Sequence, residues 1–405
     1  MRWEKVKLGD VSDSCLGKML DQEKNKGEFH PYLANINVRW GNFDLDDLPQ
    51  MRFEDDEQER YGLEYGDLVI CEGGEPGRCA IWKNELPNMK IQKALHRVRT
   101  HKCLDYRYLY YWFLWAGKRG ALEQYFTGAT IKHMPGQKLK SILIDKPPIE
   151  TQRCIADILS AYDDLIENNR KQIKLLEEAA QRLYKEWFVD LRFPGREHTR
   201  IVDGIPEGWE KRKLSDVFGY VRGKSYSSKD LAETGPVLMV NLKNIRSFGG
   251  YNRNAEKYYV GEFKGSQLLS AGDIVMGVTD MTQERRLVGH VAIIPRLHKS
   301  TIFSMDLIKL ESKSIQKYFL YSALQYGGLS RQIALLANGV NVLHLKPDAM
   351  SSLEMIIPDN SLMEQYHQIF GDLYEQIETL SEQCDLATQA RDRLLPKLMG
   401  GDVEA

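Results

Sequence analysis

Apolar and polar positions follow a helical period in two segments of the 405-residue chain, one near its middle and one at its C-terminal end. In both, apolar residues recur at alternating spacings of four and three, which is typical of one face of a long helix. The first stripe is Ile155, Leu159, Tyr162, Ile166, Asn169, Ile173, Leu176, Ala180, Leu183 and Trp187, and the second is Tyr366, Phe370, Leu373, Ile377, Leu380, Cys384, Ala387, Arg391, Leu394 and Leu398. We expect two helices, each roughly 50 to 60 Å long at about 1.5 Å per residue.

Each apolar stripe needs a partner. The other helix of the same chain is favoured, because an intramolecular partner has a high effective concentration, although a homodimeric coiled coil is an alternative. An antiparallel pair would place two globular segments at opposite ends and so set their distance. Asn169 interrupts its stripe either as a polar residue that fixes the register or as a tolerated one.

The remaining segments contain short apolar runs separated by turn signals, which is typical of mixed α/β structure. Strands are expected at residues 67–71, 273–276, 291–294 and 353–357, separated by turn signals such as Gly73-Gly74. Residues 106–116 are expected to form a helix whose aromatic residues face a core rather than stack on bases. The division is a globular domain at 1–149, a helix at 150–188, a linker at 189–208, a second globular domain at 209–358, a helix at 359–399 and a tail at 400–405.

The chain is an internal repeat, and the fold class is therefore a duplicated α+β (mixed α/β) domain with a pseudo-twofold relation. Trp3-Glu4-Lys5 and the residues up to Val11 recur 206 residues later from Trp209 to Val217. After a six-residue insertion the offset settles at 211, where Gly128 to Met134 matches Gly339 to Leu345. The halves keep glycines and apolar positions and change most polar ones, which favours one scaffold with two different surfaces.

Composition excludes several classes of protein. The six cysteines form no Cys-x-x-Cys pair, so neither a disulfide framework nor a zinc site is indicated, and a reducing cytoplasm is expected. No apolar run is long enough to span a bilayer, and no signal peptide is visible. The motifs of nucleotide-binding loops, zinc proteases, metal-dependent nucleases and amino-methyltransferases are missing. The pattern indicates a protein that recognises a ligand and leaves chemistry to others.

The net charge of −2 hides a strong sorting of charge along the chain. Residues 42–77 have a net charge of −10, residues 78–140 of +10, residues 209–350 of +8 and residues 359–405 of −7. Basic residues beside aromatic and amide side chains suit phosphate contacts and base readout, although a solvated mixed surface is the plain alternative. Duplication favours duplex DNA, which offers two sites along one axis.

The junctions between segments resemble one family. Trp187-Phe188-Val189-Asp190-Leu191-Arg192-Phe193-Pro194-Gly195, followed by Gly204-Ile205-Pro206-Glu207-Gly208-Trp209, resembles the central junction of specificity subunits from type I restriction-modification systems. Residues 147–159 and 391–401 resemble that family's entry into its first conserved helix and exit from its second. The first half lacks the Gly-Ile-Pro-Glu-Gly lead-in, so its edge is expected to be looser. The short acidic C-terminus leaves open how far the second helix returns to the first domain.

The resemblance implies a non-catalytic subunit with two target recognition domains, each reading half of a bipartite, asymmetric DNA sequence. Two methyltransferase subunits and ATP-driven restriction subunits are the implied partners, and the helices would set the gap and dock the methyltransferases. S-adenosylmethionine, ATP and Mg²⁺ would belong to those partners, with no cofactor or metal in this chain. The rival hypotheses are a duplicated protein-binding scaffold without DNA affinity and a fragment of a fused restriction enzyme.

Candidate DNA contacts come from positions whose polar chemistry differs between the halves, from the loop at 222–226 and from the inserted segment at 282–286. In the first domain they are Arg78, Lys132, Lys138 and Lys140, and in the second Arg222, Lys224, Tyr226, Arg285, Arg286 and Asn341. The repeated His133 and His344 are interpreted as structural, with a shared local hydrogen bond. The helix-packing positions are Leu159, Tyr162, Ile166, Ile173, Leu176, Leu183, Phe370, Leu373, Ile377, Leu380 and Leu394.

Overall fold

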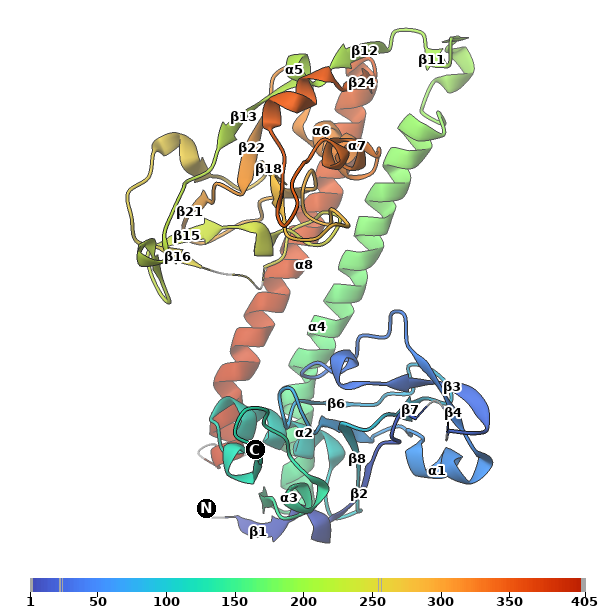
Figure 1. Ribbon diagram of the computed structural model, residues 1–405, viewed down its shortest axis with the longest axis vertical. Coiled ribbons are helices and arrows are strands. Elements are labelled where there is room, and N and C mark those ends of the chain that lie inside the picture. The colour runs from blue at the N-terminus through green and yellow to red at the C-terminus, as the bar shows by residue number, and fades with distance from the viewer. Residues whose placement is uncertain (1–2, 22, 24, 254, 256, 402–405) are drawn as a thin grey trace. The chain divides into compact units, whose positions relative to one another are not determined.

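A computed structural model describes residues 3–21, 23, 25–253, 255 and 257–401 (Figure 1). The chain forms two compact units. The first unit contains residues 1–168 and 383–405, and the second contains residues 169–382. Each long helix therefore contributes residues to both units. A division of the chain into consecutive domains does not describe this sharing. Residues 402–405 of the expected tail lie outside the described part of the chain.

The first unit is built around a four-stranded antiparallel sheet. Its order is β2 (Ser12–Leu16), β8 (Leu95–Thr100), β5 (Leu68–Cys71) and β6 (Cys79–Ile81). A smaller sheet has the order β4 (Gln50–Phe53), β3 (Glu28–Leu33) and β7 (Lys90–Ile91), with β3 and β7 parallel. Strands β1 (Glu4–Lys7) and β9 (Leu143–Lys146) pair separately, and the helices are α1 (Gln58–Tyr61), α2 (Tyr106–Lys118) and α3 (Gly136–Lys140).

The second unit repeats this plan. Its main antiparallel sheet has the order β13 (Phe218–Arg222), β22 (Leu307–Ser312), β18 (Ile274–Gly277) and β20 (Val291–Ile293). The smaller sheet has the order β14 (Leu231–Ala232), β16 (Tyr258–Tyr259), β15 (Val237–Val240), β21 (Ser300–Phe303) and β17 (Leu268–Leu269), and β15 and β21 are parallel. Further pairs join β12 (Glu210–Lys213) to β24 (Glu354–Ile357), β19 (Thr279–Asp280) to β23 (Leu343–His344) and, in the linker, β10 (Ile201–Val202) to β11 (Ile205–Pro206). The short helices are α5 (Leu214–Val217), α6 (Lys317–Gln325) and α7 (Leu329–Leu335). The predicted duplication is confirmed at the level of strand order.

Helix α2 forms where an aromatic-rich helix was predicted, and its aromatic side chains face the core. Tyr108 and Trp112 are buried, and Trp115 packs against the same cluster half-buried. Asp105 caps the helix by accepting hydrogen bonds from the backbone N–H groups of Arg107 at 2.9 Å and Tyr108 at 3.1 Å. These rings stabilise the fold, which agrees with the core interpretation over base stacking.

The edge strand of the first unit is as well paired as its counterpart in the second. Strand β1 makes four register pairs with β9, from Glu4 opposite Lys146 to Lys7 opposite Leu143, and β12 makes four with β24. The expectation of a looser first edge is therefore wrong from Glu4 onward, because β1 makes the same antiparallel pairing as β12 without that lead-in.

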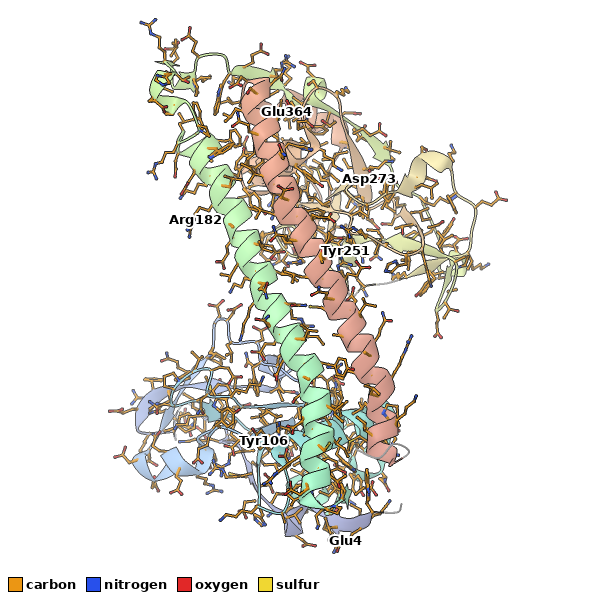
Figure 2. All side chains as sticks on the ribbon, turned by 180° about the vertical axis from the view of Figure 1, so that it is seen from behind. Glu4, Tyr106, Arg182, Tyr251, Asp273 and Glu364 are labelled. Carbon is orange, nitrogen blue, oxygen red and sulfur yellow. The ribbon has the colours of Figure 1, made fainter. Side chains whose placement is uncertain are left out.

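The two long helices are α4 (Ile149–Tyr184) and α8 (Asn360–Gly400), of 36 and 41 residues. They lie side by side and run in opposite directions within each unit (Figure 2). In the first unit Ile166 of α4 packs with Cys384 and Ala387 of α8, and Leu395, Leu398 and Met399 enter the core of the unit. The second helix thus returns to the first unit. All of the helix-packing positions proposed from the sequence are buried or half-buried.

The junction motif forms an aromatic cluster in the second unit. After α4, residues Lys185–Val189 widen into a π-helical turn. The Phe188 ring lies 5.0 Å from that of Tyr366, and the Phe193 ring 5.1 Å from that of Trp209. The motif is therefore explained by packing, since it joins the end of α4 to α8 and to the start of the second globular segment.

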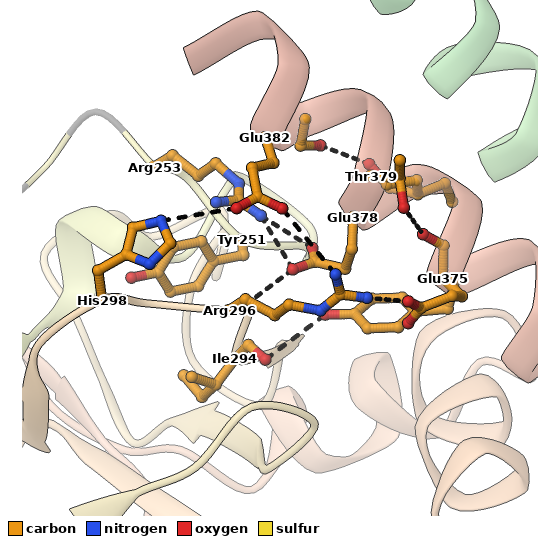
Figure 3. Close-up of polar contacts among 12 residues, drawn as sticks. Tyr251, Arg253, Ile294, Arg296, His298, Glu375, Glu378, Thr379 and Glu382 are labelled. Atoms are coloured by element: carbon orange, nitrogen blue, oxygen red, sulfur yellow. Dashed lines mark hydrogen bonds and ion pairs between the residues drawn. The ribbon is translucent and has the colours of Figure 1, made fainter. Parts of the chain in front are cut away.

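Helix α8 also holds the second globular segment by charged groups (Figure 3). The buried carboxylate of Glu378 accepts hydrogen bonds from Nη2 of Arg253 at 2.9 and 3.0 Å and from the backbone N–H of Arg296 at 2.8 Å. The Arg296 guanidinium also pairs with Glu375. In the first unit Arg391 of α8 pairs with Asp163 of α4, which accepts a hydrogen bond from the Tyr111 hydroxyl at 2.7 Å. Such contacts join α8 to loops of the second globular segment and, in the first unit, to α4, which also contacts α2.

Candidate nucleic-acid interface

Several loops of the second unit meet at one end of its main sheet. Arg222 ends β13 opposite Ile308 of β22, and Ile308 in turn pairs with Met276 near the end of β18. Beyond β18, the backbone of Val278 donates to Asp306 at 2.8 Å and accepts from Leu345 at 2.8 Å. The β13 end, the β18–β20 loop and the segment just after β23 are therefore neighbours, although they are far apart in the sequence.

The buried Asp280 carboxylate organises the β18–β20 loop. Oδ1 accepts from the backbone N–H and the hydroxyl of Thr282, both at 2.8 Å, and Oδ2 accepts from the backbone N–H groups of Leu287 at 2.6 Å and Val288 at 3.1 Å. Burial alone would raise the pKa of Asp280, but these hydrogen bonds outweigh it and the pKa is lowered. One ionised side chain thus ties both ends of the inserted segment.

The candidate arginines of this loop differ in their surroundings. Arg285 has a left-handed backbone with φ of 53°, and its Nε donates to the carbonyl of Ala334 at 3.1 Å. Arg286 has an exposed side chain. Gln283 donates from Nε2 to the carbonyl of Val340 at 2.8 Å and so connects this loop to the neighbouring exposed residue Asn341. The structure brings Arg286 and Asn341 to one group of loops.

The other candidates in the second unit follow β13. The exposed Arg222 has its guanidinium 5.9 Å from the Tyr220 ring, whose hydroxyl donates to Asp348 at 2.7 Å. Lys224 is half-buried, and its backbone is held by Phe303 and Met305. Tyr226 packs half-buried beside Met239, Tyr259 and Ile302, and burial raises its pKa. Tyr226 is therefore partly used in packing, while Arg222 faces solvent.

The first unit has the same arrangement of loops. The segment after β5 pairs with the loop at 127–133 through Gly73 and His133, and the backbone of Met134 donates to Glu72 at 2.8 Å. Lys132 is exposed on this loop, and Lys138 and Lys140 are exposed on α3 just beyond it. These three lysines lie in one short stretch of chain.

Arg78 differs from these lysines because its guanidinium is already bound. It donates from Nη2 to the backbone and side-chain oxygens of Asn35, both at 3.2 Å, and from Nη1 to Glu75 at 3.1 Å. The side chain is 18% exposed. The role of Arg78 as a DNA contact remains a prediction. The observed hydrogen bonds show that its side chain helps to hold the loop after β5 in place.

The paired histidines share backbone hydrogen bonds. His133 exchanges two backbone bonds with Thr127, at 2.7 and 2.9 Å, and His344 exchanges two with Asn338, at 3.0 and 2.9 Å. Both imidazoles are exposed. The expected shared local hydrogen bond is present, but the backbone makes it rather than the ring.

The structure adds a residue that the sequence reasoning did not single out. Asp280 lies 206 residues after Gly74, so the repeat places a glycine and a carboxylate at matching positions beside the insertion. A residue-by-residue comparison of the two halves at this position could have identified Asp280 from the sequence. The need for a charge appears only when the backbone N–H groups of Leu287 and Val288 are seen to converge on it.

Other chemistry has little support among the described residues. No group of three or more His, Cys, Asp or Glu side chains within them could hold a metal ion. The six cysteines are free thiols. None of the helices in the described ranges combines the length and the apolar character that a membrane span requires.

Two α+β units, each with basic residues on loops at one end of a sheet, define a duplicated recognition protein. A family model described as the type I restriction modification DNA specificity domain matches residues 1–178 and again residues 206–384. The chain therefore belongs to this family.

Relatives and solved structures agree with this assignment. The chain is 27% identical over 349 residues to the type I restriction enzyme MjaIX specificity subunit of Methanocaldococcus jannaschii, covering 84% of this chain and 78% of that protein. It is 23% identical to the MjaVIII specificity subunit of the same organism, covering 99% and 93%. The crystal structure of a type I restriction-modification S subunit from M. genitalium has the same fold, with a TM-score of 0.58, 18% identity and coverage of 98% and 96%.

Proposed function

We propose that this chain is the DNA-recognition subunit of a type I restriction-modification complex and has no catalytic role of its own. Each unit reads one half of a bipartite, asymmetric DNA target through the loops at the end of its main sheet. The observation that supports this most directly is the match of both halves to the DNA specificity domain family. The difference between the loop residues of the two units supports two different half-sites.

The helices have a second task in this proposal. Helices α4 and α8 set the gap between the half-sites and provide the docking surface for two methyltransferase subunits. Restriction subunits join the complex for cleavage. S-adenosylmethionine, ATP and Mg²⁺ bind to those partners, and the assembly works in the cytoplasm.

Each unit has exposed cations on its loops or on the short helix α3, and such cations suit this function. Arg222, Arg286, Lys132, Lys138 and Lys140 are all exposed, so phosphate oxygens can reach them without breaking an internal ion pair. A target base is reached by the partner methyltransferase through base flipping, so this chain contributes register and sequence readout.

The test is to map methylated adenines in DNA that has been exposed to this chain together with its methyltransferase subunit. We expect methylation within one split sequence, with two fixed parts and an unread gap. The methyltransferase subunit without this chain is the control and should leave that sequence unmethylated. A complex that binds no duplex DNA and methylates no defined sequence would favour the protein-binding scaffold instead.

A further inference from the structure

The loop of each unit that ends in a repeated histidine exposes an aliphatic side chain. Val340 is 87% exposed in the second unit, and Ile131 is 69% exposed in the first. A single exposed apolar residue needs no explanation by itself, since folded proteins expose much apolar surface. Here, however, two such residues lie in matching loops, each next to a candidate DNA contact. This coincidence needs an explanation.

The loop around Val340 is held in one shape. Its ends are joined by the two backbone hydrogen bonds between Asn338 and His344. Gly339 has φ of 154°, and a Cβ added there would lie 1.9 Å from the carbonyl oxygen of Val342, so only glycine fits. Gln283 binds the Val340 carbonyl from the neighbouring loop at 2.8 Å. The valine side chain is thus presented outward by a backbone that needs little ordering on binding.

The residues beside Val340 are polar and suited to base edges. Asn341 follows it directly and is exposed, and the exposed Arg286 belongs to the loop that contacts it through Gln283. In the major groove an A·T pair presents a thymine methyl group next to the hydrogen-bonding edge of adenine, which asparagine matches. An aliphatic side chain adjacent to an asparagine therefore fits an A·T pair.

We propose that Val340 contacts the 5-methyl group of a thymine in the half-site read by the second unit. Ile131 belongs to the matching loop of the first unit, but at the offset of 211 it aligns with Val342, so the proposal is confined to Val340. The inference rests on the proposed function. It makes Val340 a specificity-determining residue that distinguishes thymine by its methyl group, while Asn341 contacts the polar base edge.

The test uses the chain assembled with its methyltransferase and duplexes in which each thymine of the mapped target is replaced in turn by uracil, which lacks only the methyl group. We expect one replacement to weaken binding about fourfold, the factor for burying one methyl-sized group. Val340→Ala should bind the thymine and uracil duplexes equally at that position, and Val340→Ile should restore the difference. Val202→Ala, which changes an exposed valine of the linker hairpin, should keep it.

The outcomes separate this inference from the proposed function. A wild-type complex that selects its target but binds every uracil duplex as well as the thymine duplex would overturn the inference alone. The same holds if Val340→Ala keeps the fourfold difference, or if the mapped target has no thymine. A complex without any sequence preference would contradict the proposed function itself.

Discussion

Arg285 and Arg286 are adjacent in the sequence, yet their side chains have different surroundings. The Arg285 guanidinium is bound to the Ala334 carbonyl, whereas Arg286 is exposed. A cation that is already hydrogen-bonded to its own protein loses those bonds when it turns to a phosphate, so its net contribution to DNA binding is smaller. The exposure of the side chain therefore distinguishes candidate DNA contacts that look equivalent in the sequence.

Replacing both arginines with glutamine should weaken DNA binding by the methyltransferase complex and make binding less dependent on salt. The logarithmic salt slope should fall by about 1 to 2, because each phosphate contact contributes about 0.9 to it. Measuring the dissociation constant between low and moderate salt tests this. Glutamine at the exposed linker residues Arg192 and Arg200 is the matched control, and an unchanged slope in the loop variant would exclude both contacts.

Asp280→Asn should destabilise the second unit at neutral pH by about 2 kcal/mol, because an amide cannot replace a carboxylate that accepts four hydrogen bonds. The folded pKa of Asp280 is lowered, so its stabilisation is present above the ordinary pKa of 3.8 and is lost as the pH falls through the folded pKa. The difference between variant and wild type in urea unfolding should therefore shrink in acid. A difference that stays constant from pH 7 to pH 3 would contradict this role.

Among the elements, α8 carries the carboxylates that bind Arg253 and Arg296 of the second globular segment. Its Glu378 side chain is 7% exposed, while Glu382, one turn further along, is 39% exposed. Both face basic residues of the second globular segment, but only the first is withdrawn from water. The ion pair of Glu378 therefore matters more for stability than that of Glu382. Removing one partner of a buried pair leaves the other charge desolvated.

Glu378→Gln should lower the free energy of unfolding of the second unit by about 3 kcal/mol, whereas Glu382→Gln should change it by less than about 1 kcal/mol. Thermal or urea unfolding of the two variants beside the wild type measures the difference. If the two variants unfold alike, the carboxylate of Glu378 does not hold the sheet on α8.

At the scale of the whole molecule, each long helix takes part in both compact units. Residues 149–168 of α4 and 383–400 of α8 belong to the first unit, and the rest of both helices belongs to the second. A change in helix length between residues 168 and 169 alone would put the two stripes out of register. Any test of the spacer role must therefore lengthen both helices together.

Inserting seven residues after Asn168 and seven after Glu382 preserves the heptad pattern and adds about 10 Å to each helix. We expect the gap in the methylated sequence to lengthen by about 3 base pairs, at about 3.4 Å per pair, with both half-sites unchanged. Mapping methylated adenines measures the gap. Insertion into α4 alone should impair folding or assembly, and an unaltered gap after the double insertion would rule out the spacer role.

The sequence by itself determined the long helices, the repeat and the family. Helix and strand periods are local, so α4, α8 and the buried face of α2 could be predicted from residues a few positions apart. The offsets of 206 and 211 residues revealed the duplication because both halves need the same glycines and apolar positions. The junction motif around Trp187 pointed to the family without any contact being known.

Only the tertiary structure decided which charged residues are accessible. Arg78 and Arg286 are equivalent as sequence letters, but one is bound to Asn35 and Glu75 while the other is exposed. The hydrogen bonding of Asp280 likewise depends on backbone N–H groups seven and eight residues further along the chain, which converge on its carboxylate. Which groups share a hydrogen bond depends on how the loops pack, and the order of residues along the chain does not contain that information.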